Sequence, residues 1–151
     1  MVKKSELKQM RRQRACKREA NKEKKVVSLY REKSRLENFN FNREAEELYQ
    51  NTDPDEVEKL SLDQRRLYQM CEKAKMFENY QELKEMDRKL KILKESLYYD
   101  ELNDEDYYCT EMQYNDLKQS YKDRRHILTR DSHSRRLFRR CQDLDGLEEN
   151  I

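Results

Sequence analysis

The sequence predicts an all-α fold of extended long helices, with a short coiled-coil-like seam and little independent core. The 151 residues include one Gly and one Pro, the residues that most often reverse a chain in tight turns. Charged residues make up 44% of the chain and hydrophobic residues 34%, against about 25% and about 45–50% in typical globular proteins. Folding costs conformational entropy, and the burial of apolar surface is the main free-energy term that offsets this cost. A chain with so few hydrophobic residues is expected to bury only a small core by itself. We therefore expect a chain that acts by surface contact inside a larger assembly.

We expect one extended helical protein over residues 1–151, beginning with a basic N-terminal helix over residues 1–50. This first segment contains no Gly or Pro, and most of its residues are good helix formers. Residues 38–42 alternate Asn with Phe, and both residue types are poorer in helix interiors. The run is therefore expected to bend or interrupt the helix.

The middle helices are expected over residues 54–98. Pro54 suits the first position of a helix, where its missing N–H leaves nothing unpaired, and Asp53 with Glu56 would form a capping box around it. Ser61 is a second candidate N-cap, which predicts a short helix followed by a longer one.

An apolar seam follows within these middle helices. Its members alternate spacings of three and four residues, which places them on one face of a helix. Two heptads are too few to identify a coiled coil, so a partner's unlike helix and a second copy of the chain both remain candidates for the seam. The candidate partner-helix seam consists of Leu83, Met86, Leu90, Leu93 and Leu97.

An acidic, Tyr-rich connector is expected over residues 99–109, because residues 100–111 hold six acids and no base. Thr110 with Gln113 offers a capping box for the next helix. That helix, basic and C-terminal, is expected over residues 110–142.

The chain is expected to lose order toward its end. Residues 131–134, Asp-Ser-His-Ser, are a candidate break in the C-terminal helix. Residues 143–151 contain the only Gly of the chain and are expected to be a frayed tail.

The formal net charge of +2 conceals a segregated distribution. Residues 1–25 hold eleven bases and three acids. A basic helix face can follow the phosphates of a nucleic acid, and no aromatic residue precedes Tyr30, so base stacking is not indicated. A solvated or nuclear-targeting tail explains the same composition equally well. The candidate contacts to the RNA backbone or to an acidic partner share one helix face: Arg11, Arg14, Arg18 and Lys22.

Several function classes are disfavoured by what the sequence lacks. A Gly-rich phosphate loop needs more than the single Gly146, and neither the two His nor the four Cys have the spacing of metal ligands. We expect no enzymatic activity, no cofactor, no metal site and no small-molecule substrate. No stretch approaches the roughly 20 apolar residues of a membrane helix, and the first residues lack the apolar region of a signal peptide. An intracellular protein with reduced thiols is expected.

Four segments follow one another in the order found in one protein family. Residues 7–20 have a Leu-basic start and a basic-x-Glu-Ala element, and residues 33–37 spell Lys-Ser-Arg-Leu-Glu. Residues 55–75 contain the Ser61 cap and a Leu-Tyr pair, and residues 77–90 begin Phe-Glu-Asn-Tyr. In these segments the chain resembles the SYF-two family of pre-mRNA-splicing factors, in a shortened form.

The resemblance covers residues 7–98, and residues 116–130 match more faintly. The chain departs from the family in lacking the Pro-Asp-Leu-Gly turn before the Phe-x-Asp/Asn-Tyr block and the Asn-rich C-terminal element. The resemblance implies a nuclear, non-enzymatic helical scaffold of the spliceosome, with partners among the NineTeen complex and its associated proteins. The alternative is a coiled-coil cytoskeletal or tethering protein that acts by self-association through the seam.

Overall fold

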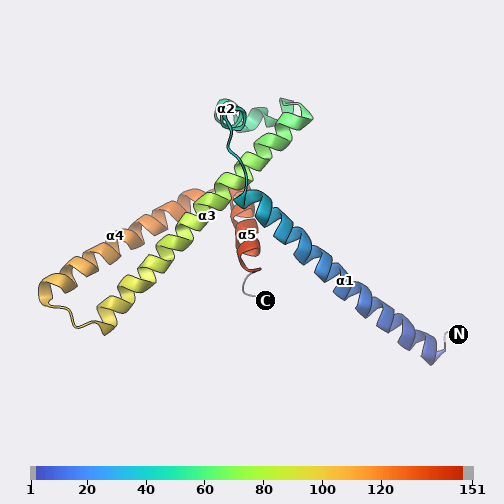
Figure 1. The fold of residues 1–151 in the computed structure, drawn as a ribbon, viewed down its shortest axis with the longest axis horizontal. Helices are drawn as coiled ribbons and strands as arrows, with labels where there is room; N and C mark the ends of the chain where they lie inside the picture. Colours follow the sequence, from blue (N-terminus) through green and yellow to red (C-terminus); the bar gives the residue numbers. More distant parts are fainter. Residues whose placement is uncertain (1–2, 148–151) are drawn as a thin grey trace.

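The computed structural model describes residues 3–147, and these residues form five α-helices, one 3-10 helix and no strand, which confirms the all-α fold. Helix α3 is the central rod, and α4 folds back beside it as a hairpin (Figure 1). Helix α1 projects from the middle of α3, α2 lies near the start of α3, and α5 lies where α1 meets α3 (Figure 1). The elements are α1 Lys4–Glu37, α2 Arg43–Asn51, η1 Pro54–Lys59, α3 Leu62–Tyr99, α4 Asp104–Leu128 and α5 Ser132–Asp145.

The main core lies where α1, α3 and α5 meet. Helix α1 contributes Leu29 and Leu36 from its C-terminal third, and the middle of α3 contributes Phe77 among others. Helix α5 brings Phe138 and Leu144 to the same cluster. Because only one end of α1 reaches this core, most of that helix extends away from it as an arm.

The break between α1 and α2 has a local cause. Helix α1 ends at Glu37, and the following Phe39 and Phe41 pack edge to face with ring centroids 4.7 Å apart against the main core. The Asn42 side chain then accepts a hydrogen bond from the Ala45 backbone N–H and caps α2. The interruption expected at residues 38–42 is thus confirmed, and the basic N-terminal helix expected over residues 1–50 is two helices in the described part of that range.

The two helix starts predicted in the middle of the chain have different outcomes. Ser61 is the N-cap of α3, and its hydroxyl accepts a hydrogen bond from the Gln64 backbone N–H, which confirms the second start. A helix also starts at Pro54 with Asp53 at the N-cap position, as expected, but it is the short 3-10 helix η1. Asp53 makes no side-chain cap bond, so the capping box expected there is wrong.

The connector between α3 and α4 is shorter than the sequence suggested. Helix α3 runs to Tyr99, and α4 begins at Asp104 after the Asn103 side chain accepts a hydrogen bond from the Asp106 backbone N–H. The expected connector over residues 99–109 and the expected cap at Thr110 are therefore wrong. Acids in the first turn of a helix interact favourably with its dipole. The part of the acidic run that starts at Asp104 therefore forms the beginning of α4.

The C-terminal part of the chain agrees with one expectation and differs from another. The helix expected over residues 110–142 is interrupted between α4 and α5, which confirms the candidate break at residues 131–134, and the Asp131 side chain there accepts a hydrogen bond from the Ser134 backbone N–H. The expected frayed tail over residues 143–151 is wrong as far as the structure describes it, because α5 continues to Asp145 and Leu147 is buried. Residues 148–151 lie outside the described residues.

We expect Leu144→Ala to lower the free energy of unfolding by about 2–5 kcal/mol, because the side chain has no exposed surface and its removal leaves a cavity in the main core. Leu62→Ala is the matched control, since 58% of Leu62 is exposed, and it should cost about 0.5 kcal/mol or less. Urea denaturation followed by circular dichroism measures both. Equal stability of the two variants would contradict the placement of α5 in the core.

Candidate nucleic-acid interface

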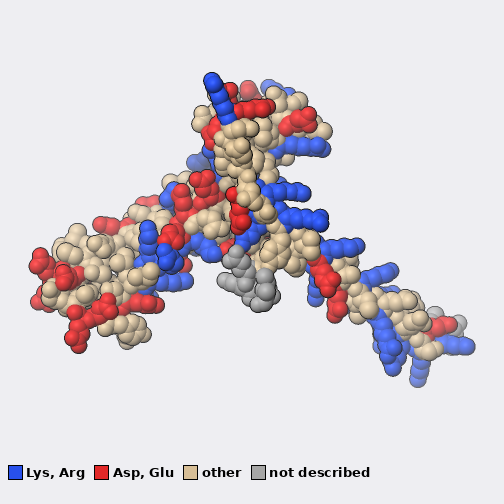
Figure 2. All heavy atoms as spheres, in the orientation of Figure 1, with Lys and Arg blue, Asp and Glu red and all other residues tan. Residues whose placement is uncertain are grey.

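Residues 4–28 of α1, here called the basic arm, are exposed throughout. They hold ten bases and three acids, and Figure 2 shows the bases along the length of the helix. An exposed helix of this charge can follow a chain of phosphates. The four predicted contacts, Arg11, Arg14, Arg18 and Lys22, are all exposed and lie on this arm.

These four residues share a face with the part of α1 that enters the core. Lys22, Leu29 and Leu36 are seven residues apart, close to two helical turns, and Arg18 precedes Leu29 by eleven residues, close to three turns. Leu29 and Leu36 are buried against the rest of the molecule. The predicted basic face of the arm therefore lies on the same side of α1 as the residues that pack into the core.

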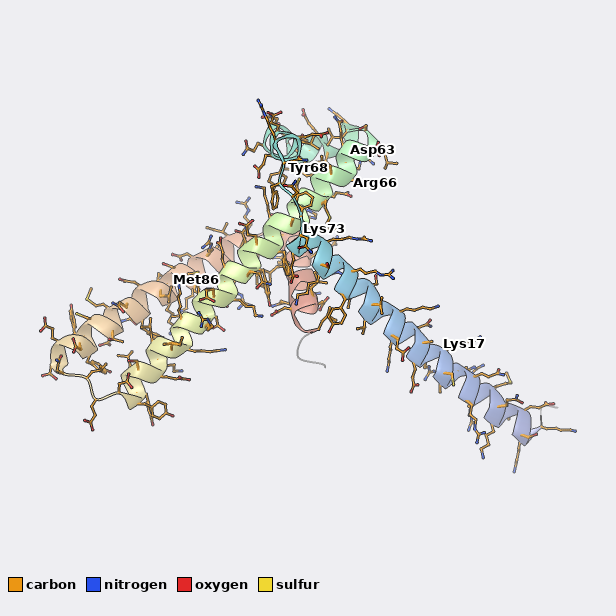
Figure 3. The ribbon with its side chains drawn as sticks, viewed as in Figure 1. Lys17, Asp63, Arg66, Tyr68, Lys73 and Met86 are labelled. Carbon is orange, nitrogen blue, oxygen red and sulfur yellow. The ribbon has the colours of Figure 1, made fainter. Side chains whose placement is uncertain are left out.

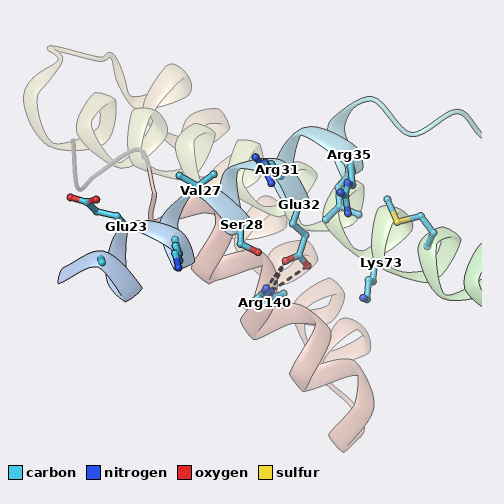
Figure 4. Close-up of a pocket in the computed structure, with 12 residues that line it drawn as sticks. Glu23, Val27, Ser28, Arg31, Glu32, Arg35, Lys73 and Arg140 are labelled. Carbon is cyan, nitrogen blue, oxygen red and sulfur yellow. Dashed lines mark hydrogen bonds and ion pairs between the residues drawn. The ribbon is translucent and has the colours of Figure 1, made fainter. Parts of the chain in front are cut away.

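A groove of about 990 Å³ lies at the root of the arm, between α1, α3 and α5 (Figure 4). We call it the root groove. Most of its wall comes from residues 20–36 of α1, with Lys73 and Met70 from α3 and Arg140 from α5. No aromatic side chain lines it.

The root groove is positively charged. Glu23 and Glu32 are its only acidic lining residues. The Arg140 Nε donates to both carboxylate oxygens of Glu32, at 3.0 and 3.2 Å, and this hydrogen bonding raises the pKa of Arg140. In Figure 4, the Glu32 carboxylate faces the Arg140 guanidinium. This pair takes up one acid and one base, so Glu23 remains against the four other lining bases: Lys24, Arg31, Arg35 and Lys73.

Lys24, Arg31 and Arg35 lie on a different face of α1 from the predicted stripe. They are separated by seven and four residues, so they share one side of the helix, and all three are exposed. Lys17, a further seven residues toward the N-terminus, continues this side along the arm (Figure 3). Sequence spacing alone would have found this second stripe. Nothing in the sequence indicated that Lys73 and Arg140 lie beside it.

The predicted seam is covered by α4 of the same chain. Leu83 and Leu90 are buried, and Met86, Leu93 and Leu97 are half-buried. Helix α4 lies along this face (Figures 1 and 3). Its half-buried residues Thr110, Tyr114, Leu117 and Tyr121 have the same three- and four-residue spacing, and Leu128 follows seven residues later. The assignment of the seam to a helix of another protein is therefore corrected, since an antiparallel helix of this chain occupies it.

The tip of the α3–α4 hairpin gathers acids and tyrosines. Tyr98 is 81% exposed and packs edge to face on Tyr99, with ring centroids 4.8 Å apart. Tyr107 and Tyr108 are exposed on the first turns of α4. Figure 2 shows acids gathered at this end of the hairpin, far from the free end of α1. The two ends of the molecule therefore carry opposite charge.

Within residues 3–147 the structure shows neither a cluster of metal-ligating side chains nor a helix that could span a membrane. Across this range no group of three or more His, Cys, Asp or Glu side chains is arranged to hold a metal ion. The imidazole of His133 pairs with the Glu72 carboxylate, which joins α5 to α3. No helix in the same range has the length and apolar character to cross a membrane.

Comparison with protein-family models, with curated proteins and with solved structures found no match for this chain. The function that follows is therefore argued from the residues and their placement.

We expect the stability of the protein to fall above pH 9, in part because burial raises the pKa of the Cys141 thiol from its ordinary 9.0 to about 12. The folded state favours the protonated thiol, so this contribution is complete below pH 9 and is lost as the pH rises through about 12. Each pH unit in this window changes the free energy of unfolding by at most about 1.4 kcal/mol for one group. Burial and a hydrogen bond to Asp145 also raise the pKa of Tyr80, which adds to the slope.

Urea denaturation at several pH values between 8 and 11 measures this dependence. Cys141→Ala should make the slope shallower, whereas Cys109→Ala, at an exposed site, should leave it unchanged. Identical slopes for wild type and Cys141→Ala would show that the thiol does not contribute.

Proposed function

We propose that this chain is a non-enzymatic nuclear scaffold that takes part in pre-mRNA splicing as a component of the spliceosome. Its basic arm would contact the RNA backbone, and its partners would be spliceosomal proteins of the NineTeen complex and their associates. The proposal combines the sequence resemblance with the charge and exposure of α1.

The observation that carries the RNA contact is the exposure of the basic arm over residues 4–28. A helix with ten bases and three acids along about 37 Å, at about 1.5 Å per residue, presents many phosphate contacts without a pocket. The arm has no aromatic side chain for base stacking. Binding of this kind positions a protein on RNA without reading its sequence.

The scaffold role is supported by the separation of charged surfaces. The α1 arm and the hairpin tip point away from the main core in different directions (Figure 1). Each is an extended helical element, so partners bound at the two ends would be held apart from each other. The self-association alternative depended on a free seam, and the cover that α4 provides argues against it.

Affinity purification of the full chain from nuclear extract at low salt tests the proposal. We expect splicing proteins and small nuclear RNA to be recovered, and we expect the RNA to be lost as the salt concentration is raised, because phosphate contacts release bound counterions. A variant that replaces the predicted stripe by Gln, at Arg11, Arg14, Arg18 and Lys22, should recover less RNA than wild type.

The matched control removes four charges elsewhere on the exposed surface, by substituting Gln for Lys59, Arg66, Lys89 and Lys94. It should recover as much RNA as wild type. Recovery of the chain alone, or of cytoskeletal proteins without splicing components, would refute the spliceosomal role.

A further inference from the structure

We infer that the root groove is an RNA-backbone site, in which bases of α1 and α3 hold phosphates that continue along the arm. This inference rests on the proposed RNA contact and assigns to it a place that the sequence did not indicate. It differs from the predicted stripe because it requires the folded crossing of α1, α3 and α5.

The first step is the continuity of the second stripe on α1. Lys17, Lys24, Arg31 and Arg35 share one side of the helix. From the first to the last they cover 18 residues, or about 27 Å at about 1.5 Å per residue. The stripe starts on the free arm and ends inside the groove. A polyanion that follows it is therefore led into the groove.

The second step is the contribution of the other two helices. Lys73 of α3 lines the same groove as Arg35 of α1, and it lies near the crossing of the two helices (Figure 3). Arg140 of α5 lines it as well and holds Glu32 in a charge-assisted pair. That pair removes one of the two carboxylates that would repel a phosphate. The groove thus concentrates positive charge on more than one side of its space.

The third step is that these bases are available. Within residues 3–147, the structure gives no ion-pair partner to Lys24, Arg31, Arg35 or Lys73. Other bases near the core are paired, as Lys75 is with Glu46 at 3.3 Å and Arg124 is with Glu82. Unpaired positive side chains that face the same groove repel one another, and an anion bound between them removes this repulsion.

The chemistry of the lining favours RNA over an acidic protein segment. Protein interfaces depend on well-packed apolar and aromatic anchors at their centre. The apolar part of this groove consists of small or aliphatic side chains, such as Val27 and Leu36, without an aromatic ring. The guanidinium and ammonium groups that line this groove instead match phosphate oxygens. We therefore commit to the RNA backbone as the occupant.

The test uses the full chain and a fluorescent single-stranded RNA of mixed sequence, with affinity measured by anisotropy over a series of salt concentrations. Lys73→Gln removes a groove base that lies on α3, outside the basic helix. We expect it to weaken binding by about 3- to 10-fold at low salt and to lower the salt slope by about 0.7, the value for one phosphate contact to a single strand. Lys89→Gln is the matched control, because Lys89 is exposed on the same helix and does not line the groove. It should change affinity by less than about twofold.

A second measurement uses the wild-type chain, so its outcome does not depend on whether a substitution disturbs folding. Lysine acetylation followed by mass spectrometry should show that RNA protects Lys24 and Lys73 and leaves Lys89 reactive. Competition with poly-glutamate, at the same charge concentration as unlabelled RNA, distinguishes an acidic protein from RNA. We expect RNA to displace the probe far more effectively.

The outcomes separate the inference from the proposed function. Equal effects of Lys73→Gln and Lys89→Gln, with no protection of Lys73, would overturn the groove while leaving RNA binding by the arm in place. Displacement by poly-glutamate as effective as by RNA would overturn the choice of RNA as the occupant. No binding by wild type at low salt would overturn both the groove and the proposed RNA contact.

Discussion

The packing of α5 into the angle between α1 and α3 is the interaction on which the rest of the structure depends. Leu144 is fully buried there, and the C-terminal end of α5 is hydrogen-bonded to both neighbours. The Tyr80 hydroxyl donates to Asp145 at 3.0 Å, and the Tyr30 hydroxyl donates to the Leu147 carbonyl at 3.2 Å. Helix α5 contacts both α1 and α3, so it adds apolar surface to the place where these two helices meet. The direction of the basic arm and the existence of the root groove both follow from this one helix.

A small core is enough because each long helix needs to be fixed at only one place. Most of α3 beyond the crossing is stabilised by α4, through the seam that contains Leu83 and Leu90. Side-chain packing between antiparallel helices supplies much of the stability that propensity alone does not. The remaining length of α1 has no neighbour within the described residues, so it depends on its own hydrogen bonds and on helix-forming residues such as Ala, Lys, Arg and Glu.

The sequence predicted helices and their faces better than it predicted their neighbours. The all-α fold, the Ser61 cap and the shared face of the seam follow from periodicity and capping, which are local. The partner of the seam was assigned wrongly because the chain reverses at residues 100–103 without Gly or Pro, by means of polar caps. The core face of α5 was missed because four arginines surround Phe138 and Cys141, which recur at helical spacing. Of the groove, only the α1 side was visible in the sequence, since contacts to Lys73 and Arg140 depend on tertiary structure.

The charge of the arm connects its folding to its function. Arg14, Arg18 and Lys22 follow one another at four-residue spacing, and like charges at that spacing destabilise a helix by a few tenths of a kcal/mol per pair. Only Glu6, Glu19 and Glu23 offset this repulsion within the arm. A bound polyanion would remove the repulsion, so its binding energy would also stabilise the helical form of the arm, by the linkage that applies to any ligand of the folded state. The part of α1 outside the main core carries a row of positive charges, so its helical form is most stable when phosphates lie along it. If the arm contacts RNA as proposed, this linkage would keep it helical although it has so little apolar surface.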